Sequence, residues 1–424
     1  MQKSIKRKER FSRAIARSTR AVLEKLYNIP DKPESIKYFY DILKDTFVEN
    51  RPAISAERYS GIKKIGIYCM MVPEELIYAA GAIPVRLCGG SFEASCAGDE
   101  LLPRDTCPVV KASVGFTAFE LNSLYDLCDL IIVPATCDAK RKMAEELAQY
   151  KEVVLLEVPH VKDSEKAKKE WLEHIYALKK YLEKYTGQKI TRARLHSAAI
   201  MLDRARYQTR RLYELRKSSR PLICGRLALP VMNAYGIDMA DNWTKAMEKL
   251  NNEFEKKKQG SLDICENKIP RIFIAGCPSI FPNWKIPFII EESGGIVVSE
   301  ESCTGERFLY DPVAVTEKSL SHLMNSLAAK YIMPCICPSF SPNKDRLFRL
   351  QQIVEGFNVT GIIYYVLKGC LLYDFELKRV EDTLRDMDIP VLRVETDYNP
   401  EDVEQLRTRI EAFMEMLVSK KRNV

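Results

Sequence analysis

"LPRDTCPVVKASVGFTAFELNSLYDLCDLIIVPATCDAKRKMAEEL", residues 102–147, is the stretch that decides the fold. Cys107 stands directly before Pro108, a residue favoured in the first turn of a helix, and a helical pattern follows. The apolar run from Leu130 to Val133 then has the length and composition of a buried strand, and Cys137 lies between it and a second helical pattern. Helix, strand and helix in this order predict one unit of a parallel sheet that is covered by helices.

The same alternation occurs before and after this stretch. Strands are predicted at residues 63–69, 83–88, 129–134, 153–158, 271–277, 296–303, 361–370 and 389–395. Between the two groups, residues 163–257 form long charged helical patterns with few strand signals. The predicted fold class is therefore α/β, with two Rossmann-like parallel-sheet lobes, a helical N-terminal arm and a helical insertion. The predicted domains are 1–54 (basic helical arm), 55–162 (first lobe), 163–265 (helical region) and 266–424 (second lobe).

Composition indicates a globular protein with a large core, because 46% of the 424 residues are hydrophobic and 29% are charged. No run of about 18 apolar residues is present, so we expect no membrane-spanning helix and no membrane partner. The N-terminus lacks the apolar centre of a signal peptide, and a cytoplasmic protein is expected.

Positive charge is concentrated at the N-terminus. Residues 1–25 contain nine Lys or Arg residues and two Glu residues, and this excess of seven equals the net charge of the whole chain. A basic arm is compatible with nucleic-acid binding, but Phe11 is the one aromatic residue there that could stack on a base. We therefore expect a solvated helix that contacts a partner subunit, and no nucleic-acid partner.

The thirteen cysteines are the main functional signal. Cys107 precedes a predicted helix, and five others follow predicted strands: Cys69, Cys137, Cys277, Cys303 and Cys370. Ligands collect beyond the carboxyl ends of parallel strands, and helix N-termini there favour thiolates, the form that binds metals. The alternative is that free cysteine serves as a small core residue, which we expect for about half of the thirteen.

The spacing of these cysteines favours an iron–sulfur cluster over zinc. Structural zinc sites commonly use closely spaced cysteine pairs, and this chain has one close pair, Cys335 and Cys337. The four histidines lie mostly in or beside the charged helical region, so mixed Cys and His ligation is poorly supported. Thiolates without histidine are typical of iron–sulfur clusters.

Several stretches resemble the subunits of 2-hydroxyacyl-CoA dehydratases and benzoyl-CoA reductases. They are "GIYCMMVPEELIYAAGAIPVRLCG", "CDLIIVPATCDAKRKMAEEL", "GIIYYVLKGCLLYDFE", "IPVLRVETDY" and "QLRTRIEAFMEML", and the resemblance covers roughly residues 55–420. In that family three cysteines of each subunit bind one 4Fe–4S cluster. The resemblance implies that Cys107, Cys137 and Cys370 do so here.

The remaining cysteines make the chain most similar to the double-cubane branch of that family. In this branch six cysteines hold an [8Fe-9S] cluster, which implies Cys69, Cys303 and Cys337 as the second three ligands, with Cys335 as a substitute for Cys337. The other cysteines are then expected to be core or loop residues, with Cys277 the least secure member of the group Cys88, Cys96, Cys128, Cys224, Cys265 and Cys277.

The resemblance also implies a homodimer that receives low-potential electrons from a separate ATP-hydrolysing iron–sulfur reductase and reduces a small-molecule substrate. The chain contains no G-x-x-x-x-G-K-[ST] motif, which agrees with ATP binding to the partner. The alternative is a 2-hydroxyacyl-CoA dehydratase or acyl-CoA reductase subunit with one 4Fe–4S cluster. No catalytic residue is assigned. Glu74, Glu75 and Lys140 could donate protons or tune the cluster, or could be solvated charges at helix starts.

Overall fold

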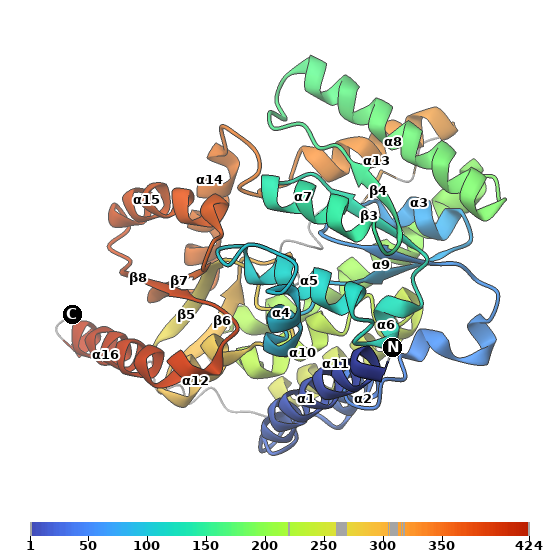
Figure 1. Cartoon of the computed structure of the whole chain (residues 1–424). Helices are drawn as coiled ribbons and strands as arrows, with labels where there is room; N and C mark the ends of the chain where they lie inside the picture. The colour runs from blue at the N-terminus through green and yellow to red at the C-terminus, as the bar shows by residue number, and fades with distance from the viewer. Residues whose placement is uncertain are drawn as a thin grey trace.

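The computed structural model describes residues 2–218, 221–259, 269–303, 305, 313, 314, 316 and 319–422. Its first sheet has the order β2-β1-β3-β4, with all neighbours parallel (Figure 1). The strands are β1 (Lys64–Ile67), β2 (Ile83–Arg86), β3 (Leu130–Pro134) and β4 (Glu152–Leu156). The sheet is parallel because helical crossovers connect successive strands.

The second sheet repeats this plan with the order β6-β5-β7-β8, again entirely parallel. Its strands are β5 (Arg271–Gly276), β6 (Ile296–Glu300), β7 (Gly361–Leu367) and β8 (Val391–Thr396). Both central strands, β5 and β7, are buried along their whole length, as expected for strands covered on both faces. The predicted fold class, with two α/β lobes of similar topology, is confirmed.

Helices cover both sheets and fill the space between them (Figure 1). In the first half they are α1 (Gln2–Tyr27), α2 (Lys37–Phe47), α3 (Glu74–Ala79), α4 (Phe92–Gly98), α5 (Pro108–Ala118), α6 (Ser123–Asp126) and α7 (Asp138–Leu147). The predicted helical region contains α8 (Glu165–Thr186), α9 (Arg192–Lys217), α10 (Gly225–Asn233) and α11 (Ala240–Gln259). The last five are α12 (Lys285–Glu292), α13 (Leu320–Ile332), α14 (Lys344–Gly356), α15 (Leu371–Arg385) and α16 (Val403–Arg422). Short 3-10 helices are Glu34–Ile36, Ala53–Ser55, Glu57–Tyr59 and Pro400–Asp402.

The basic arm is a long amphipathic helix, α1, whose apolar face packs on its own chain. Phe11, Ile15, Leu23 and Leu26 are buried in the same core as the two lobes. Lys8 pairs with Glu120 at 2.7 Å, a contact that ties the arm to the first lobe. Its docking therefore needs no partner subunit, while its outer face remains exposed.

The lobes share packing rather than standing apart. A second core beneath the first sheet includes Trp171 of α8 and Leu327 of α13, although α13 belongs to the second half of the sequence. The Trp171 indole donates a hydrogen bond to the Ala328 carbonyl at 2.9 Å.

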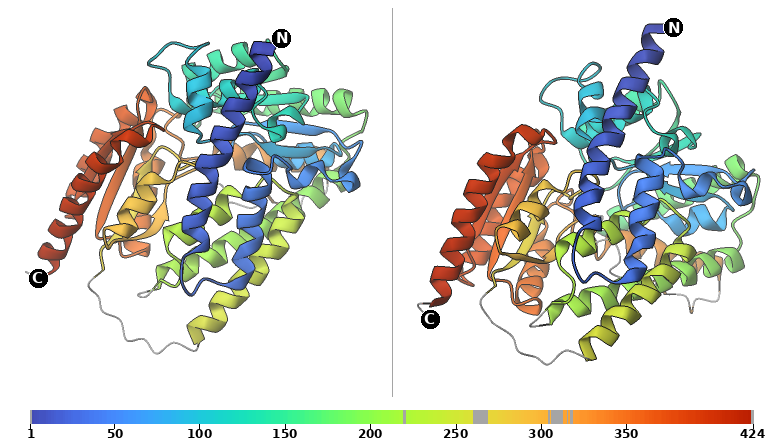
Figure 2. Two further views of the ribbon diagram at one scale, coloured as in Figure 1. Left: turned by 60° about the horizontal axis from the view of Figure 1, so that its bottom comes forward. Right: turned by 90° about the horizontal axis from the view of Figure 1, so that it is seen from below.

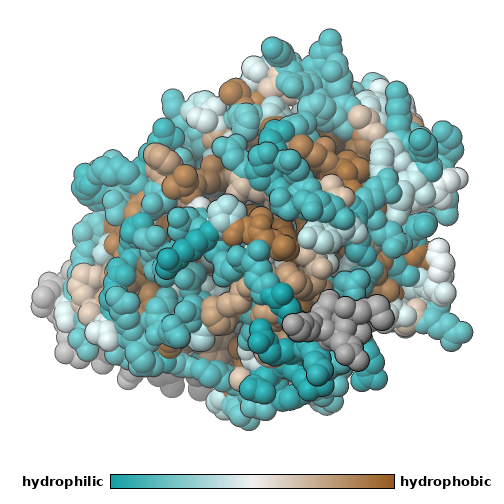
Figure 3. Space-filling model, in the orientation of Figure 1, coloured by the Kyte–Doolittle hydropathy of each residue, from teal (hydrophilic) through white to brown (hydrophobic). Residues whose placement is uncertain are grey.

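Figure 3 shows a mainly hydrophilic outer face with hydrophobic residues gathered near its centre. No helix in the described part of the chain has the length and apolar character that a membrane crossing requires.

Helix α14 lies where the sequence analysis assigns no element, although Leu347, Leu350 and Val354 recur at helical spacing. Arg346, fully buried, occupies a core position of this helix beside Leu350 and Ile353. Its guanidinium contacts both oxygens of Glu301 at 2.7 and 2.8 Å and Glu376 at 3.1 Å. This buried network joins α14 and α15 to the end of β6.

Replacing Arg346 tests that network. The Arg346→Ala variant leaves buried carboxylates without their cation, and it should lower the free energy of unfolding by about 3–5 kcal/mol. The exposed Arg385, which pairs with Asp382 on the surface of α15, provides the control. Chemical denaturation of Arg385→Ala should match the wild type within error, and an equal loss in both variants would contradict the assigned role of Arg346.

Candidate metal centre

Three of the predicted ligands begin helices. Cys107, Cys137 and Cys370 are the N-cap residues of α5, α7 and α15. Each sulfur is close to backbone N–H groups of the first helical turn, those of Val109 and Lys140 among them. These N–H groups and the positive end of the helix dipole favour a thiolate. The predicted position of these cysteines at the start of a helix is confirmed.

Cys370 lies within hydrogen-bonding distance of two other thiols, Cys107 and Cys277. Hydrogen bonds from Cys107 and then Cys277 lower the pKa of Cys370 to about 3. The pKa values of Cys107 and Cys277 are raised, the first mainly by its bond to Cys370 and the second mainly by burial. Hydrogen bonding within the trio therefore favours the thiolate form of Cys370, and residues of both lobes form the trio.

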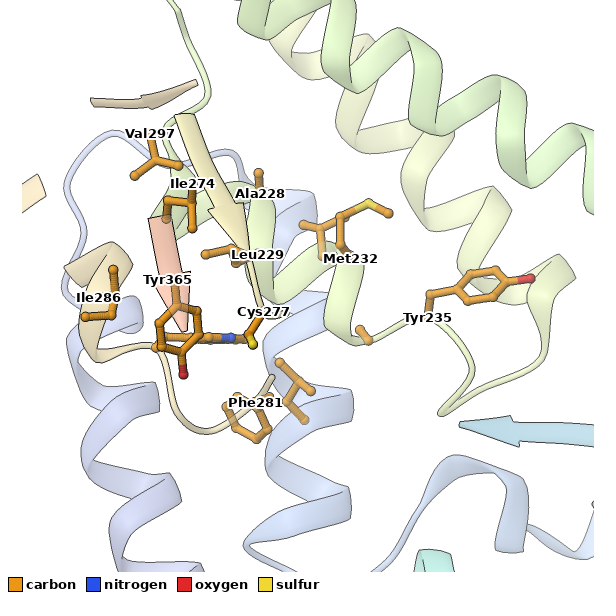
Figure 4. Packing of buried hydrophobic residues seen from close by; sticks show 14 of the residues in the cluster. Ala228, Leu229, Met232, Tyr235, Ile274, Cys277, Phe281, Ile286, Val297 and Tyr365 are labelled. Atoms are coloured by element: carbon orange, nitrogen blue, oxygen red, sulfur yellow. The ribbon is translucent and has the colours of Figure 1, made fainter. Parts of the chain in front are cut away.

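Cys277 is the thiol that the sequence analysis assigns to the core. It follows β5, and Figure 4 shows it among Tyr365, Phe281 and Leu229. The Leu367 N–H also donates to its sulfur at 3.4 Å. The sequence already showed that Cys277 follows a predicted strand. Cys69, Cys137, Cys303 and Cys370, which were assigned as cluster ligands, have the same position.

The second group of thiols surrounds Cys69. This residue has a φ of 70°, in the left-handed region, at the end of β1. Its pKa lies well below the usual value because Cys303 donates a hydrogen bond to its sulfur, with help from Lys140 and the N–H groups of Met70 and Met71. Strained backbone of this kind concentrates at functional sites. Cys69 and Cys303, which are 234 positions apart in the chain, are therefore brought together as the resemblance implies.

Cys88, expected to be a core residue, also belongs to this group. The Cys69 N–H donates to its sulfur, while burial raises its pKa. Next to it Arg86 reaches from β2 to the Cys303 carbonyl at 3.4 Å and forms an ion pair with Glu74 at 2.8 Å. Glu74 is therefore held in a structural ion pair rather than exposed at a helix start.

Lys140 connects the two groups of thiols. This half-buried lysine, in the first turn of α7, interacts electrostatically with Cys69, Cys137, Cys88 and Cys303, and these charges raise its pKa against the effect of burial. It also contributes to the lowered pKa of Cys370. Of the two readings considered for Lys140, an electrostatic effect on the thiols is the one that its position supports. Glu75, by contrast, is buried between Arg206 at 2.6 Å and Lys330 at 2.7 Å.

Cys335 and Cys337 both lie in the second core, but they have different neighbours. Cys337 is close enough to Cys137 to raise the pKa of Cys137 electrostatically. The Cys335 sulfur contacts the Met71 sulfur at 3.5 Å. Cys128 contacts the Leu124 carbonyl in the first core, Cys96 is half-buried on α4, and Cys224 begins α10. Cys265 lies outside the described residues.

Two cavities adjoin the thiols. A cavity of about 40 Å³ is lined by Cys69, Cys88, Cys303 and mainly apolar neighbours such as Phe281. A wider one of about 520 Å³ is lined by residues that flank Cys107 and Cys370, namely Thr106, Pro108 and Gly369, and by Lys111, Lys368 and Asp397. The first has room for roughly three water-sized groups.

The thiols form two groups and do not meet at one point. Within the described residues, no three Cys, His, Asp or Glu side chains converge as ligands of a single metal ion. In a cubane cluster each cysteine binds a different iron atom, so its ligands lie around the cluster and need not converge. Thiols from both lobes, gathered about one lysine without histidine, fit such a group.

These features define a two-lobed α/β protein with a thiol-rich site at the lobe boundary, and comparison with known proteins identifies its family. Residues 69–417 match the family model "2-hydroxyglutaryl-CoA dehydratase, D-component", and the chain belongs to this family.

Individual relatives agree with this assignment. The chain is 34% identical over 364 residues to a protein of Escherichia coli (strain K12) provisionally named dehydratase subunit YjiM, covering 84% of this chain and 92% of that protein. It is 24% identical to the beta subunit of (R)-2-hydroxyglutaryl-CoA dehydratase from Acidaminococcus fermentans, covering 84% and 93%. It is 26% identical to the (R)-phenyllactyl-CoA dehydratase beta subunit of Clostridium sporogenes, covering 90% and 99%.

The ionisation of Cys370 gives a prediction for the metal-free protein. With a pKa of about 3, compared with about 8.5 for an ordinary thiol, Cys370 should remain a thiolate at about pH 5. Between these two pKa values the folded state binds fewer protons than the unfolded state. The contribution of Cys370 to the free energy of unfolding therefore grows as the pH rises and is lost as the pH falls towards 3. Ultraviolet thiolate absorbance should therefore persist at about pH 5.

The Cys370→Ser variant should lose part of that absorbance. Cys96 is the matched control, because burial raises its pKa and it is protonated in this range. Cys96→Ser should leave the absorbance unchanged. Equal absorbance in the wild type and Cys370→Ser would show that Cys370 is not the ionised member of the trio.

Proposed function

We propose that this protein is the iron–sulfur component of a low-potential electron-transfer enzyme. The observation that carries the proposal is the gathering of thiols from both lobes around Lys140, with thiolates at Cys69 and Cys370. Buried thiolates next to a lysine are the donor set that an anionic cluster requires. Membership of a family named for dehydratase components supports an enzymatic role.

The proposed cluster is a double cubane, [8Fe-9S]. Cys107, Cys137 and Cys370 would hold one half and Cys69, Cys303 and Cys337 the other, while Cys335 faces Met71 and is the weaker candidate. A bound cluster of this type supplies electrons at low potential. The chain itself stabilises the thiolates through the N-termini of α5, α7 and α15 and through Lys140.

Electrons would come from a separate ATP-hydrolysing iron–sulfur reductase. The sequence has no phosphate-binding motif of the G-x-x-x-x-G-K-[ST] type, and this supports ATP hydrolysis on a partner. The substrate would be a small molecule, as the resemblance to the double-cubane branch implies.

A second candidate function is that of a 2-hydroxyacyl-CoA dehydratase subunit with one 4Fe–4S cluster on Cys107, Cys137 and Cys370. The names of the two CoA dehydratase beta subunits favour it. Iron and sulfide analysis after oxygen-free purification separates the candidates. About eight iron atoms per chain support the double cubane, about four support the dehydratase, and none would overturn both.

Ligand replacement tests the second half of the cluster. The Cys303→Ser variant should lose about half of the bound iron, because only one cubane keeps its three thiolates. Cys96→Ser should keep the full iron content, since Cys96 lies on α4 outside both groups of thiols. Full iron content in Cys303→Ser would remove Cys303 from the ligand set.

Lys140 should set the reduction potential of the bound cluster. The Lys140→Met variant removes a positive charge beside the thiolates, which makes the addition of an electron harder and shifts the potential to more negative values. Lys140→Arg retains the charge and should stay close to the wild type. A redox titration monitored by electron paramagnetic resonance measures the shift, and equal potentials in all three proteins would contradict this role.

A further inference from the structure

Tyr398 is a buried tyrosine whose hydroxyl has no partner among the described residues. It follows β8, which lies at the edge of the second sheet (Figure 2 shows this sheet behind the red C-terminal helix), and it is 4% exposed. It also lines the cavity of about 520 Å³ beside Cys107 and Cys370. A buried hydroxyl without a hydrogen bond costs free energy, so such a group in a native protein calls for an explanation.

The chain on both sides of Tyr398 is held by hydrogen bonds. The Asn399 N–H donates to the Asp397 carboxylate at 2.8 Å, and the Lys285 ammonium donates to the Asn399 carbonyl at 2.7 Å. Asp397 also forms an ion pair with Lys368 at 3.0 Å. These contacts anchor the backbone around Tyr398, which keeps its hydroxyl in the buried position.

Thiols lie close to this tyrosine. Tyr398 is near enough to Cys107, Cys88 and Cys277 to interact with them electrostatically. Cys107 and Cys277 are members of the trio, whereas Cys88 belongs to the second group of thiols. None of these three sulfurs is within hydrogen-bonding distance of the hydroxyl. The tyrosine is therefore a neighbour of both groups of thiols and is bonded to neither.

The wide cavity does not supply the missing partner. Its lining includes Lys111 and Lys368, and it has room for water and small molecules. The Tyr398 hydroxyl oxygen, however, is closed off from solvent. A molecule in the cavity would need access to that oxygen in order to bond to it. The partner is therefore expected on the interior side of the ring, where the thiols lie.

We propose that Tyr398 is a positioning residue whose hydroxyl donates a hydrogen bond to a sulfur atom of the bound iron–sulfur cluster. This inference rests on the proposed function, because the cluster supplies the acceptor. Hydrogen bonds to the sulfur atoms of a cluster are one of the factors that set its reduction potential. A phenol keeps its proton up to about pH 10 and so remains a donor at neutral pH. The hydroxyl costs stability in the cluster-free chain and gains its partner when the cluster binds.

A redox titration of the protein purified without oxygen, monitored by electron paramagnetic resonance, tests this role. The Tyr398→Phe variant keeps the ring and removes the donor, so it should bind as much iron as the wild type. The hydrogen bond stabilises the reduced, more negative cluster, and its loss should move the potential to more negative values. At a fixed applied potential, the ratio of reduced to oxidised cluster should fall at least about threefold.

Tyr40→Phe is the matched control. Tyr40 of α2 also has a buried hydroxyl to which no group in the described part of the chain is bonded. Its neighbouring thiol is Cys224, which lies outside both groups of thiols. Tyr40→Phe should therefore keep the wild-type potential. In the cluster-free chain both variants remove a hydroxyl that costs free energy, so both should need more denaturant to unfold than the wild type.

Three results would overturn the role of Tyr398 and leave the proposed function standing. The first is a wild-type potential in Tyr398→Phe at full iron content, and the second is an equal shift in Tyr40→Phe. The third is a lower stability of the cluster-free Tyr398→Phe chain, which would show that the hydroxyl is bonded within the protein. A wild type that binds no iron would overturn the proposed function and this role together, so the two failures are distinguishable.

Discussion

The site between the lobes depends on the stabilisation of negative charge away from bulk water. Burial alone does the opposite, as Cys128 shows: desolvation raises its pKa, and it keeps its proton. Cys224 shows that a helix N-terminus is not sufficient either. It begins α10, but burial and the neighbouring Glu291 raise its pKa to about 12. Cys69 and Cys370 differ because thiol donors, backbone N–H groups and Lys140 act on them together.

Buried ion pairs hold the segments that carry these thiols. Glu300 ends β6 and Glu301 follows it, just before Cys303, and both are buried. Arg216 contacts Glu300 at 3.0 Å from α9, and Arg346 contacts Glu301 from α14. Such pairs contribute little net stability compared with apolar packing of the same volume, but they have few alternative geometries. Here these ion pairs fix the position of the chain at the end of β6, and this places Cys303 next to Cys69.

The fold could be predicted from the sequence because its signals are local. Alternating apolar runs such as Ile131–Val133 and helical patterns mark each β/α unit without reference to the rest of the chain. α14 was missed although Leu347, Leu350 and Val354 recur at helical spacing, and nothing in the local sequence shows that Arg346 is a core residue. Its partner Glu301 lies 45 positions earlier, and no local pattern can show that the two meet.

The same distinction applies to the thiols. Each strand-to-helix position could be predicted, but the partner of each thiol depends on how the two sheets face each other. Cys277 and Cys88 have the same local context as accepted candidates, and only the tertiary structure places them beside Cys370 and Cys69. Lys140, Glu74 and Glu75 all lie in a first helical turn, but their environments differ. Lys140 lies near the thiols, whereas Glu74 and Glu75 are bound in ion pairs.

The two candidate functions make different demands on the space around the thiols. A site for small molecules needs a confined apolar volume next to the electron source, as beside Cys69 and Cys303. An acyl thioester is much larger, and such ligands need a cavity of roughly 300–1,000 Å³. The cavity beside Cys107 and Cys370, at about 520 Å³ and lined by Lys111, Lys368 and Asp397, has that size. A single 4Fe–4S cluster on Cys107, Cys137 and Cys370 would leave Cys69 and Cys303, beside the smaller cavity, without a role. The double cubane accounts for both sets of cysteines.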